Sequence, residues 1–299
     1  MTGLAPPSAV AMNLAGVVEF PTVGSTPYRI DRDGRPYVPV GDGGIVLGVR
    51  LGDPVSAFAA DHAAPGATIA HPDQAARLAL TAWSCIGNPV RVRDGGAAGA
   101  TGFVLGKRGE EGRVVVGLPE EALARLRPGD GISVRAFGQG AALQGAPTDV
   151  HLLNLDPRLL AVLGVAVTGQ RVTVPVRAVV PSRLAGNGVG RPAQMWDLDL
   201  AFPVGDPTLA ALRLGDLLAI ADLDVRHNMG FRRGWMTVGV VVHGDSPQPG
   251  HGPGVTPVLT GPAAVLVPEA DLTGTQRLTW AALAEVSGAG VTSEEARER

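Results

Sequence analysis

The chain has 299 residues, of which 45% are hydrophobic and 18% charged, and its formal net charge is −3. This composition is typical of a folded globular protein and excludes a largely disordered chain. The nearly balanced charge provides no overall attraction to nucleic acid or to an anionic membrane, so binding of either kind would have to be local.

The cysteine content and the apolar runs indicate the cellular compartment in which the protein is expected. Cys85 is the only cysteine, which excludes an intramolecular disulfide and a cysteine-rich zinc site. The first residues lack the basic and apolar regions of a signal peptide, and the longest apolar run, residues 159–167, is too short to span a bilayer. We therefore expect a cytoplasmic protein with no membrane partner.

Short apolar runs, separated by glycine and proline, predict many short strands. In chain order the expected strands are 45–51, 89–93, 103–106, 114–117, 132–137, 172–180, 217–222, 236–243 and 264–267. Helical patterning is confined to 73–86, 119–125, 157–163 and 279–286, with Asp73 and Thr279 as N-cap residues. The expected fold class is mainly β (α+β), with several small β-barrel or sandwich-like domains and a few short helices.

Turn and strand signals predict three domains and a tail. These are a β-rich domain (1–86), a small barrel (87–148), a second β-rich domain (149–286) and a flexible tail (287–299). Residues 87–107 resemble the KOW segment of ribosomal and transcription-factor SH3-like barrels. Between 91 and 135 there are eight basic and six acidic residues, which is a weak footprint for phosphate.

Histidine and aspartate cluster between residues 222 and 254. If the flanking runs are strands, Asp222 and Asp224 share one face, and so do His243 and Asp245. Imidazole and carboxylate together suit a zinc or manganese ion, so these four residues are predicted metal ligands. The same residues also fit ordinary turns, because aspartate bonds nearby backbone amides.

Three further residues are predicted to complete the site as catalytic groups. Asp61 and His62 form a second Asp/His grouping in the N-terminal third, and His251 lies in the glycine-rich loop 250–254. The glycine clusters of the chain lack the strand-then-helix context of a phosphate-binding loop, so no nucleotide cofactor is expected.

Several motifs resemble the prokaryotic domain-of-unknown-function family 4438. They include Val38-Pro39-Val40-Gly41-Asp42-Gly43-Gly44, Ala60-Asp61-His62-Ala63-Ala64-Pro65-Gly66, Ser84-Cys85-Ile86-Gly87-Asn88, Asn154-Leu155-Asp156-Pro157-Arg158 and Val242-His243-Gly244-Asp245-Ser246. The resemblance runs over nearly the whole chain and implies a shared β-rich fold, with no reaction attached. Asp245 and the glycine loop after it are also similar in placement to a metal-linked region of the acetamidase/formamidase family, whose full motif is absent here.

These observations predict a metal-dependent hydrolase of a small polar, amide-like substrate. One alternative is an RNA- or ribosome-associated module that uses the 87–138 barrel through Arg91, Arg93, Lys107 and Arg108. The other alternative is a non-catalytic oligomeric scaffold. The expected partners are a small-molecule ligand and further copies of the chain, with nucleic acid a less favoured one.

Overall fold

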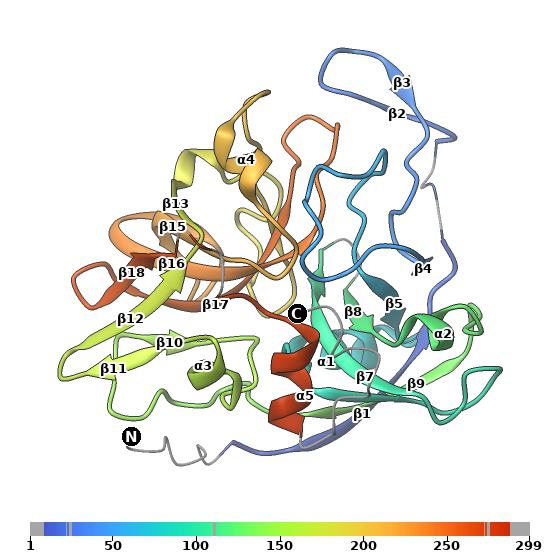
Figure 1. Cartoon of the computed structure of the whole chain (residues 1–299), viewed down its shortest axis with the longest axis horizontal. Coiled ribbons are helices and arrows are strands. Elements are labelled where there is room, and N and C mark those ends of the chain that lie inside the picture. The colour runs from blue at the N-terminus through green and yellow to red at the C-terminus, as the bar shows by residue number, and fades with distance from the viewer. Residues whose placement is uncertain are drawn as a thin grey trace.

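The computed structural model describes residues 9–287 except 22, 24–25, 110–111, 272 and 274–275. This part of the chain is mainly β, with a closed six-stranded barrel and a few short helices, which confirms the expected fold class (Figure 1). None of its helices is long and apolar enough to cross a membrane. The predicted tail lies, beyond Ser287, outside the described residues.

The barrel strands are all antiparallel, and the barrel closes where its first strand pairs with its last, Val17 opposite Ala70. Around the barrel the strands are β1 (Met12–Val18), β9 (Gly131–Ala136), β6 (Pro89–Val92), β7 (Thr101–Arg108), β8 (Arg113–Gly117) and β5 (Gly66–Ala70), with β4 (Ile45–Val46) added beside β5. Val104, Val116 and Ile132 are fully buried. Alternate residues of a strand face opposite sides, so these β-branched side chains fill the interior.

Helix α1 (Gln74–Trp83) packs on the barrel through Leu80, which belongs to the barrel core. The Asp73 carboxylate accepts a hydrogen bond from the Ala76 amide at 2.8 Å, which confirms the predicted N-cap. The helix is shorter than expected because Ser84 is already extended.

A second sheet holds most of the C-terminal half. Its strands are, in order, β10 (His151–Leu152), β17 (Gly254–Pro262), β16 (Gly230–His243), β15 (Leu217–Asp224) and β13 (Ala178–Pro181), and β14 (Leu198–Asp199) also pairs with β17. Only β13 and β15 run parallel; the other pairs are antiparallel.

The remaining elements are small. A three-stranded sheet contains β11 (Ala166–Thr168), β12 (Arg171–Val176) and β18 (Leu266–Ala270), and β2 (Arg29–Ile30) with β3 (Pro36–Tyr37) forms a separate hairpin. The helices are α2 (Glu120–Leu123), α3 (Leu159–Val162), α4 (Pro207–Ala211), α5 (Trp280–Ser287) and the 3-10 turn η1 (Ser182–Leu184). In Figure 1 the β2–β3 hairpin projects from the top of the molecule, above β4 and β5.

The barrel and the second sheet share one hydrophobic core. Phe103 and Leu105 of β7 cluster with Leu217, Val238 and Val258 of the second sheet. The contact is close, because a Cβ at Gly106 of β7 would lie 2.4 Å from Val242 Cγ1 of β16. This junction is where the candidate site lies.

The expected domain boundary at residue 86 does not match the sheet. Strands β1 and β5, from the first 86 residues, are members of the same closed barrel as β6 to β9. The paired strands of the barrel are far apart in the sequence, so the spacing of the apolar runs could not predict which strands pair. The unit 87–148 is therefore only part of the barrel.

Two basic residues of the expected RNA-binding face are buried at the junction. Lys107 donates hydrogen bonds to Ala82 O, Asn154 Oδ1 and Gln194 O, and Arg108 pairs with Asp42. Side chains that are buried and partnered inside the chain cannot contact phosphate groups, so this part of the expected surface is wrong.

Candidate metal centre

The second sheet aligns three residues from three neighbouring strands. In the β14–β17 pair Asp199 stands opposite Gly254, and in the β16–β17 pair His243 stands opposite Gly254. Directly opposed residues of a sheet point to the same face. Because Gly254 has no side chain, Asp199 and His243 meet across the middle strand.

Loops from elsewhere bring two more histidines to this place. His62 precedes β5, and its peptide nitrogen donates to Asp245 O at 3.2 Å, which ties its loop to the end of β16. His251 lies in the loop before β17. His62 is centred 5.0 Å from both His243 and His251, so three imidazoles form one cluster, in which His62 and His243 are buried.

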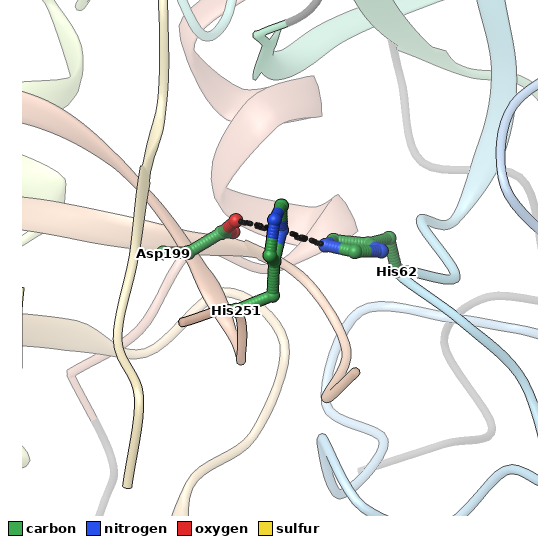
Figure 2. Close-up of side chains that lie close together, drawn as sticks. All are labelled: His62, Asp199 and His251. Carbon is green, nitrogen blue, oxygen red and sulfur yellow. Dashed lines mark hydrogen bonds and ion pairs between the residues drawn. The ribbon is translucent and has the colours of Figure 1, made fainter. Parts of the chain in front are cut away.

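The first group of potential ligand atoms contains His62 Nε2, His251 Nδ1 and Asp199 Oδ2 (Figure 2). The two histidine nitrogens are 3.0 Å apart, and Asp199 Oδ2 lies 2.8 Å from His251 Nδ1 and 3.6 Å from His62 Nε2. Ligands on a tetrahedral zinc with bonds of about 2.0–2.1 Å are separated by about 3.3–3.4 Å. The three atoms therefore need only small shifts to bind one ion.

The second group contains His243 Nε2, Asp197 Oδ2 and Asp199 Oδ1. His243 Nε2 lies 2.7 Å from Asp197 and 3.2 Å from Asp199. Asp199 belongs to both groups and offers a different oxygen to each.

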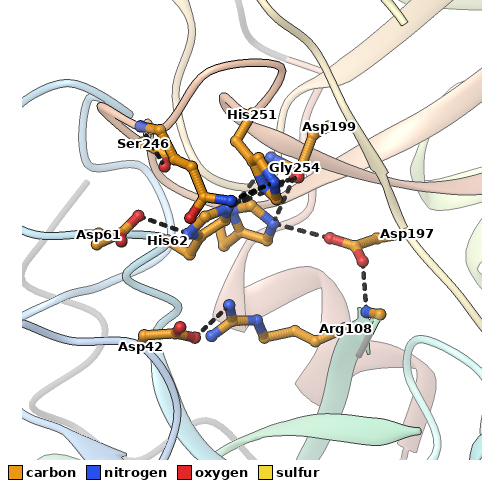
Figure 3. A network of polar contacts seen from close by, with 12 residues as sticks. Asp42, Asp61, His62, Arg108, Asp197, Asp199, Ser246, His251 and Gly254 are labelled. Carbon is orange, nitrogen blue, oxygen red and sulfur yellow. Dashed lines mark hydrogen bonds and ion pairs between the residues drawn. The ribbon is translucent and has the colours of Figure 1, made fainter. Parts of the chain in front are cut away.

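The far ring nitrogen of each histidine has its own neighbour, and Figure 3 shows Asp61 beside His62. His62 Nδ1 lies 2.6 Å from Asp61 Oδ1, His243 Nδ1 lies 2.9 Å from Gly244 O, and His251 Nε2 lies 2.7 Å from the side-chain amide of Gln248. Such outer contacts fix the tautomer and the orientation of histidines that bind metals. They leave His62 Nε2, His243 Nε2 and His251 Nδ1 facing the carboxylates.

The charges of the site favour positive charge between the carboxylates. Burial lowers the pKa of His243, but Asp197 and Asp199 outweigh it and raise that pKa to about 10. Burial likewise opposes the charged form of Asp199, yet the surrounding histidines hold its pKa well below the usual range. A divalent cation would supply the same positive charge and displace the protons.

Two arginines and a tyrosine support the centre, and Figure 3 shows one of them, Arg108, below the cluster beside Asp42. Asp42 accepts from Arg29 at 2.8 Å and from Arg108 at 2.6 Å, and Arg29 also reaches Asp61 at 3.1 Å. The Tyr37 hydroxyl donates a hydrogen bond to the Asp61 carboxylate at 2.9 Å. Asp61, which orients His62, is thus itself held from two sides.

A pocket of about 530 Å³ adjoins the centre. It is lined by Tyr28, Arg29 and Ile30 of the hairpin segment and by Gln248 of the loop opposite. Arg29 contacts Asp61, and Gln248 contacts His251, so two lining residues are directly bonded to the site.

Four of the predicted site residues meet here: Asp61, His62, His243 and His251. Asp245 lies beside them, outside both groups; its carboxylate accepts from the Ser246 amide at 2.8 Å and lies 3.9 Å from Arg32. Burial raises the pKa of this carboxyl.

The prediction that Asp222 and Asp224 join the same site is wrong in its geometry. Ala221 pairs with Met236, seven residues before His243 along β16, which is about 23 Å at roughly 3.3 Å per residue. Asp222 accepts from the Gly234 amide, and Asp224 pairs with Arg226 and Arg232.

Sequence reasoning missed Asp197 and Asp199. The motif Asp-Leu-Asp occurs at 197–199 and again at 222–224, and closeness to His243 along the chain favoured the second copy. An available signal was the alternation of Leu198, Leu200 and Phe202, which predicts a strand with Asp197 and Asp199 together on its other face.

Fold and site together define a mainly β protein in which a closed barrel packs on a second sheet around a buried His/Asp cluster. The chain belongs to the DUF4438 family: the N-terminal family domain matches residues 28–161 and the C-terminal one matches 162–275, both described as domains of unknown function. The resemblance seen in the sequence is thereby confirmed.

One solved structure with a similar fold is the crystal structure of TM1086. It is 34% identical over 95% of this chain and 97% of that chain, with a TM-score of 0.85. No curated protein matches the chain.

Proposed function

We propose that this protein is a metal-dependent hydrolase of a small polar, amide-like substrate. The observation that carries the proposal is the convergence of His62 Nε2, His251 Nδ1 and Asp199 Oδ2 in a buried place. Two imidazoles and a carboxylate are a ligand set that suits zinc or manganese and leaves a position for water.

The residues take roles that differ in part from the expected ones. His62 and His251, expected as catalytic groups, serve as ligands, and Asp61 orients His62. A divalent ion held by His62, His251 and Asp199 would supply a water of lowered pKa and a Lewis acid for the substrate carbonyl. Asp245, next to the ligands and outside them, accepts the proton of the attacking water and returns it to the departing amine as the C–N bond breaks.

The pocket at the β2–β3 hairpin supports the proposal that the substrate is a small molecule. Its volume of about 530 Å³ falls in the usual range for small-molecule sites, and two of its lining residues, Arg29 and Gln248, contact Asp61 and His251. The lining combines apolar side chains with a guanidinium and an amide, which suits a substrate that has both apolar and polar groups.

The test is metal analysis by plasma mass spectrometry on untagged protein purified without chelator. His62→Ala and Asp199→Asn should lose the metal that the wild type holds. Asp222→Asn and His227→Ala are matched controls, because Asp222 lies far along the sheet from His243 and His227 is exposed. Release of ammonia from a panel of small amides then measures the activity.

Retention of metal by the controls and its loss in the two site variants would support the proposal, as would ammonia release that follows the metal content. A wild-type protein with no metal after supplementation with zinc and manganese would overturn it.

A further inference from the structure

We propose that the centre binds two divalent cations, bridged by the carboxylate of Asp199. His62, His251 and Asp199 Oδ2 hold one ion, and His243, Asp197 and Asp199 Oδ1 hold the other. The inference rests on the proposed function and deepens it, because it assigns a second metal site in the same cluster.

The two oxygens of Asp199 face different partners. Oδ2 lies 2.8 Å from His251 Nδ1, whereas Oδ1 lies 3.2 Å from His243 Nε2. A carboxylate that offers one oxygen to each of two ligand sets has the geometry of a bridge. The ions of two-metal sites are typically about 3.5–4 Å apart, a spacing that one carboxylate can span.

Asp199 Oδ1 is buried and has no hydrogen-bond partner within the described part of the chain. The whole residue is only 3% exposed. A buried acceptor without a donor is costly, and either a protonated His243 ring or a bound cation at this place would stabilise Oδ1. His243 Nε2 lies 3.2 Å from Oδ1, and a carboxylate oxygen of Asp197 belongs to the same group of atoms, all within 4.8 Å of one another.

The position of His243 Nε2 also favours a cation at this place. Nε2 lies between two carboxylates, 2.7 Å from Asp197 and 3.2 Å from Asp199. Nδ1 of the same ring contacts both Gly244 O at 2.9 Å and the Gly254 amide nitrogen at 3.2 Å. A bound ion would take the place of a proton on Nε2 and be held by this nitrogen and the two carboxylates.

Gly254 keeps room for this second ligand set. A Cβ at this residue would lie 1.9 Å from His243 Nε2 and 2.6 Å from Asp197 Oδ2. No other residue type could occupy the middle strand without displacing these two ligand atoms.

Two ions would act as a pair on the amide-like substrate. In two-metal hydrolytic sites the ions together stabilise the attacking and the leaving groups. With a second ion, we therefore expect the rate of amide hydrolysis to depend on the occupancy of both sites, and not on the first site alone.

The experiment is a titration of chelator-treated, full-length protein with Zn²⁺, with the bound metal counted after desalting. Wild type and Asp222→Asn should bind two ions per chain, and Asp197→Asn and His243→Gln should bind one. Mn²⁺ in place of Zn²⁺ provides a measurement independent of the variants: at two equivalents, the electron paramagnetic resonance spectrum of the wild type should show two coupled Mn²⁺ ions.

One ion per wild-type chain, with a spectrum of isolated Mn²⁺, would overturn the two-ion inference and leave the proposed function standing. No bound ion would overturn both. Two ions retained by Asp197→Asn and by His243→Gln would overturn the assignment of the second site to these residues. Should either variant fail to fold by circular dichroism, the wild-type spectrum decides.

Discussion

His243 Nε2 lies 3.2 Å from Asp199 Oδ1, although the two residues belong to strands that are not neighbours in the sheet. The strand between them, β17, contributes Gly254 at the position opposite both. The absence of one side chain thus allows two potential ligands to meet across a distance that a larger residue would block.

Replacement of Gly254 by Ala should disrupt the centre. The new Cβ would displace His243 and Asp197, and we expect at least tenfold weaker Zn²⁺ binding and a loss of about 1–3 kcal/mol in the free energy of unfolding from overpacking. Gly254 does not have a positive φ, so the effect reports crowding and not backbone strain.

Gly230→Ala is the matched control for this change. It lies in the same sheet, and the nearest atom to its added Cβ is Asn228 O at 3.7 Å. Calorimetric titration and urea unfolding of both variants measure the difference. Equal Zn²⁺ affinity in the two variants would contradict the prediction.

Asp61→Asn should weaken metal binding without removing it. Asp61 lies 2.6 Å from His62 Nδ1 and is outside both ligand groups. Loss of such an outer carboxylate typically lowers metal affinity by roughly 10- to 100-fold. The Zn²⁺ dissociation constant, measured by competition with a chelating dye, should rise by this factor at unchanged stoichiometry; loss of an ion from the count would instead make Asp61 a ligand.

Asp245→Asn should separate binding from catalysis. If Asp245 transfers the proton, the variant keeps its metal, while kcat for amide hydrolysis falls by roughly 10²- to 10⁴-fold. Asp245 also lies 3.9 Å from Arg32, so Arg32→Gln controls for loss of that ion pair. A kcat equal to that of wild type would remove Asp245 from the mechanism.

Lys107 should impose a dependence of stability on pH. It is the only lysine of the chain and is 1% exposed, and burial lowers its pKa to about 8. The unfolded chain, with a lysine pKa of about 10.4, binds this proton more tightly between pH 8 and 10. The free energy of unfolding should therefore rise with pH in this window, by at most about 1.4 kcal/mol per pH unit.

Lys107→Met is the comparison for this pH dependence. Methionine is of similar length and does not titrate, so the part of the slope due to Lys107 should vanish in the variant. Urea unfolding at pH 7.5, 8.5 and 9.5 measures both proteins. The same slope in both would show that Lys107 does not titrate in this range.

Local signals in the sequence predicted the fold class, the start of α1 at Asp73 and four of the six residues of the candidate centre. Hydrophobic runs and turn residues are local signals, and they correctly predicted a mainly β chain with few helices. The same local reasoning selected Asp61, His62, His243 and His251, because histidines close to aspartates are conspicuous in any chain.

Which aspartates lie beside these histidines depends on how the strands pair in the folded chain. Asp197 and Asp199 lie more than 40 residues before His243 along the chain, and the pairing of β14 and β16 with the same strand β17 brings them together. Asp222 lies closer in sequence, but antiparallel pairing of β15 with β16 carries it away from the site. Strand register is a long-range property of the folded chain, which is also why the barrel closed across the expected domain boundary.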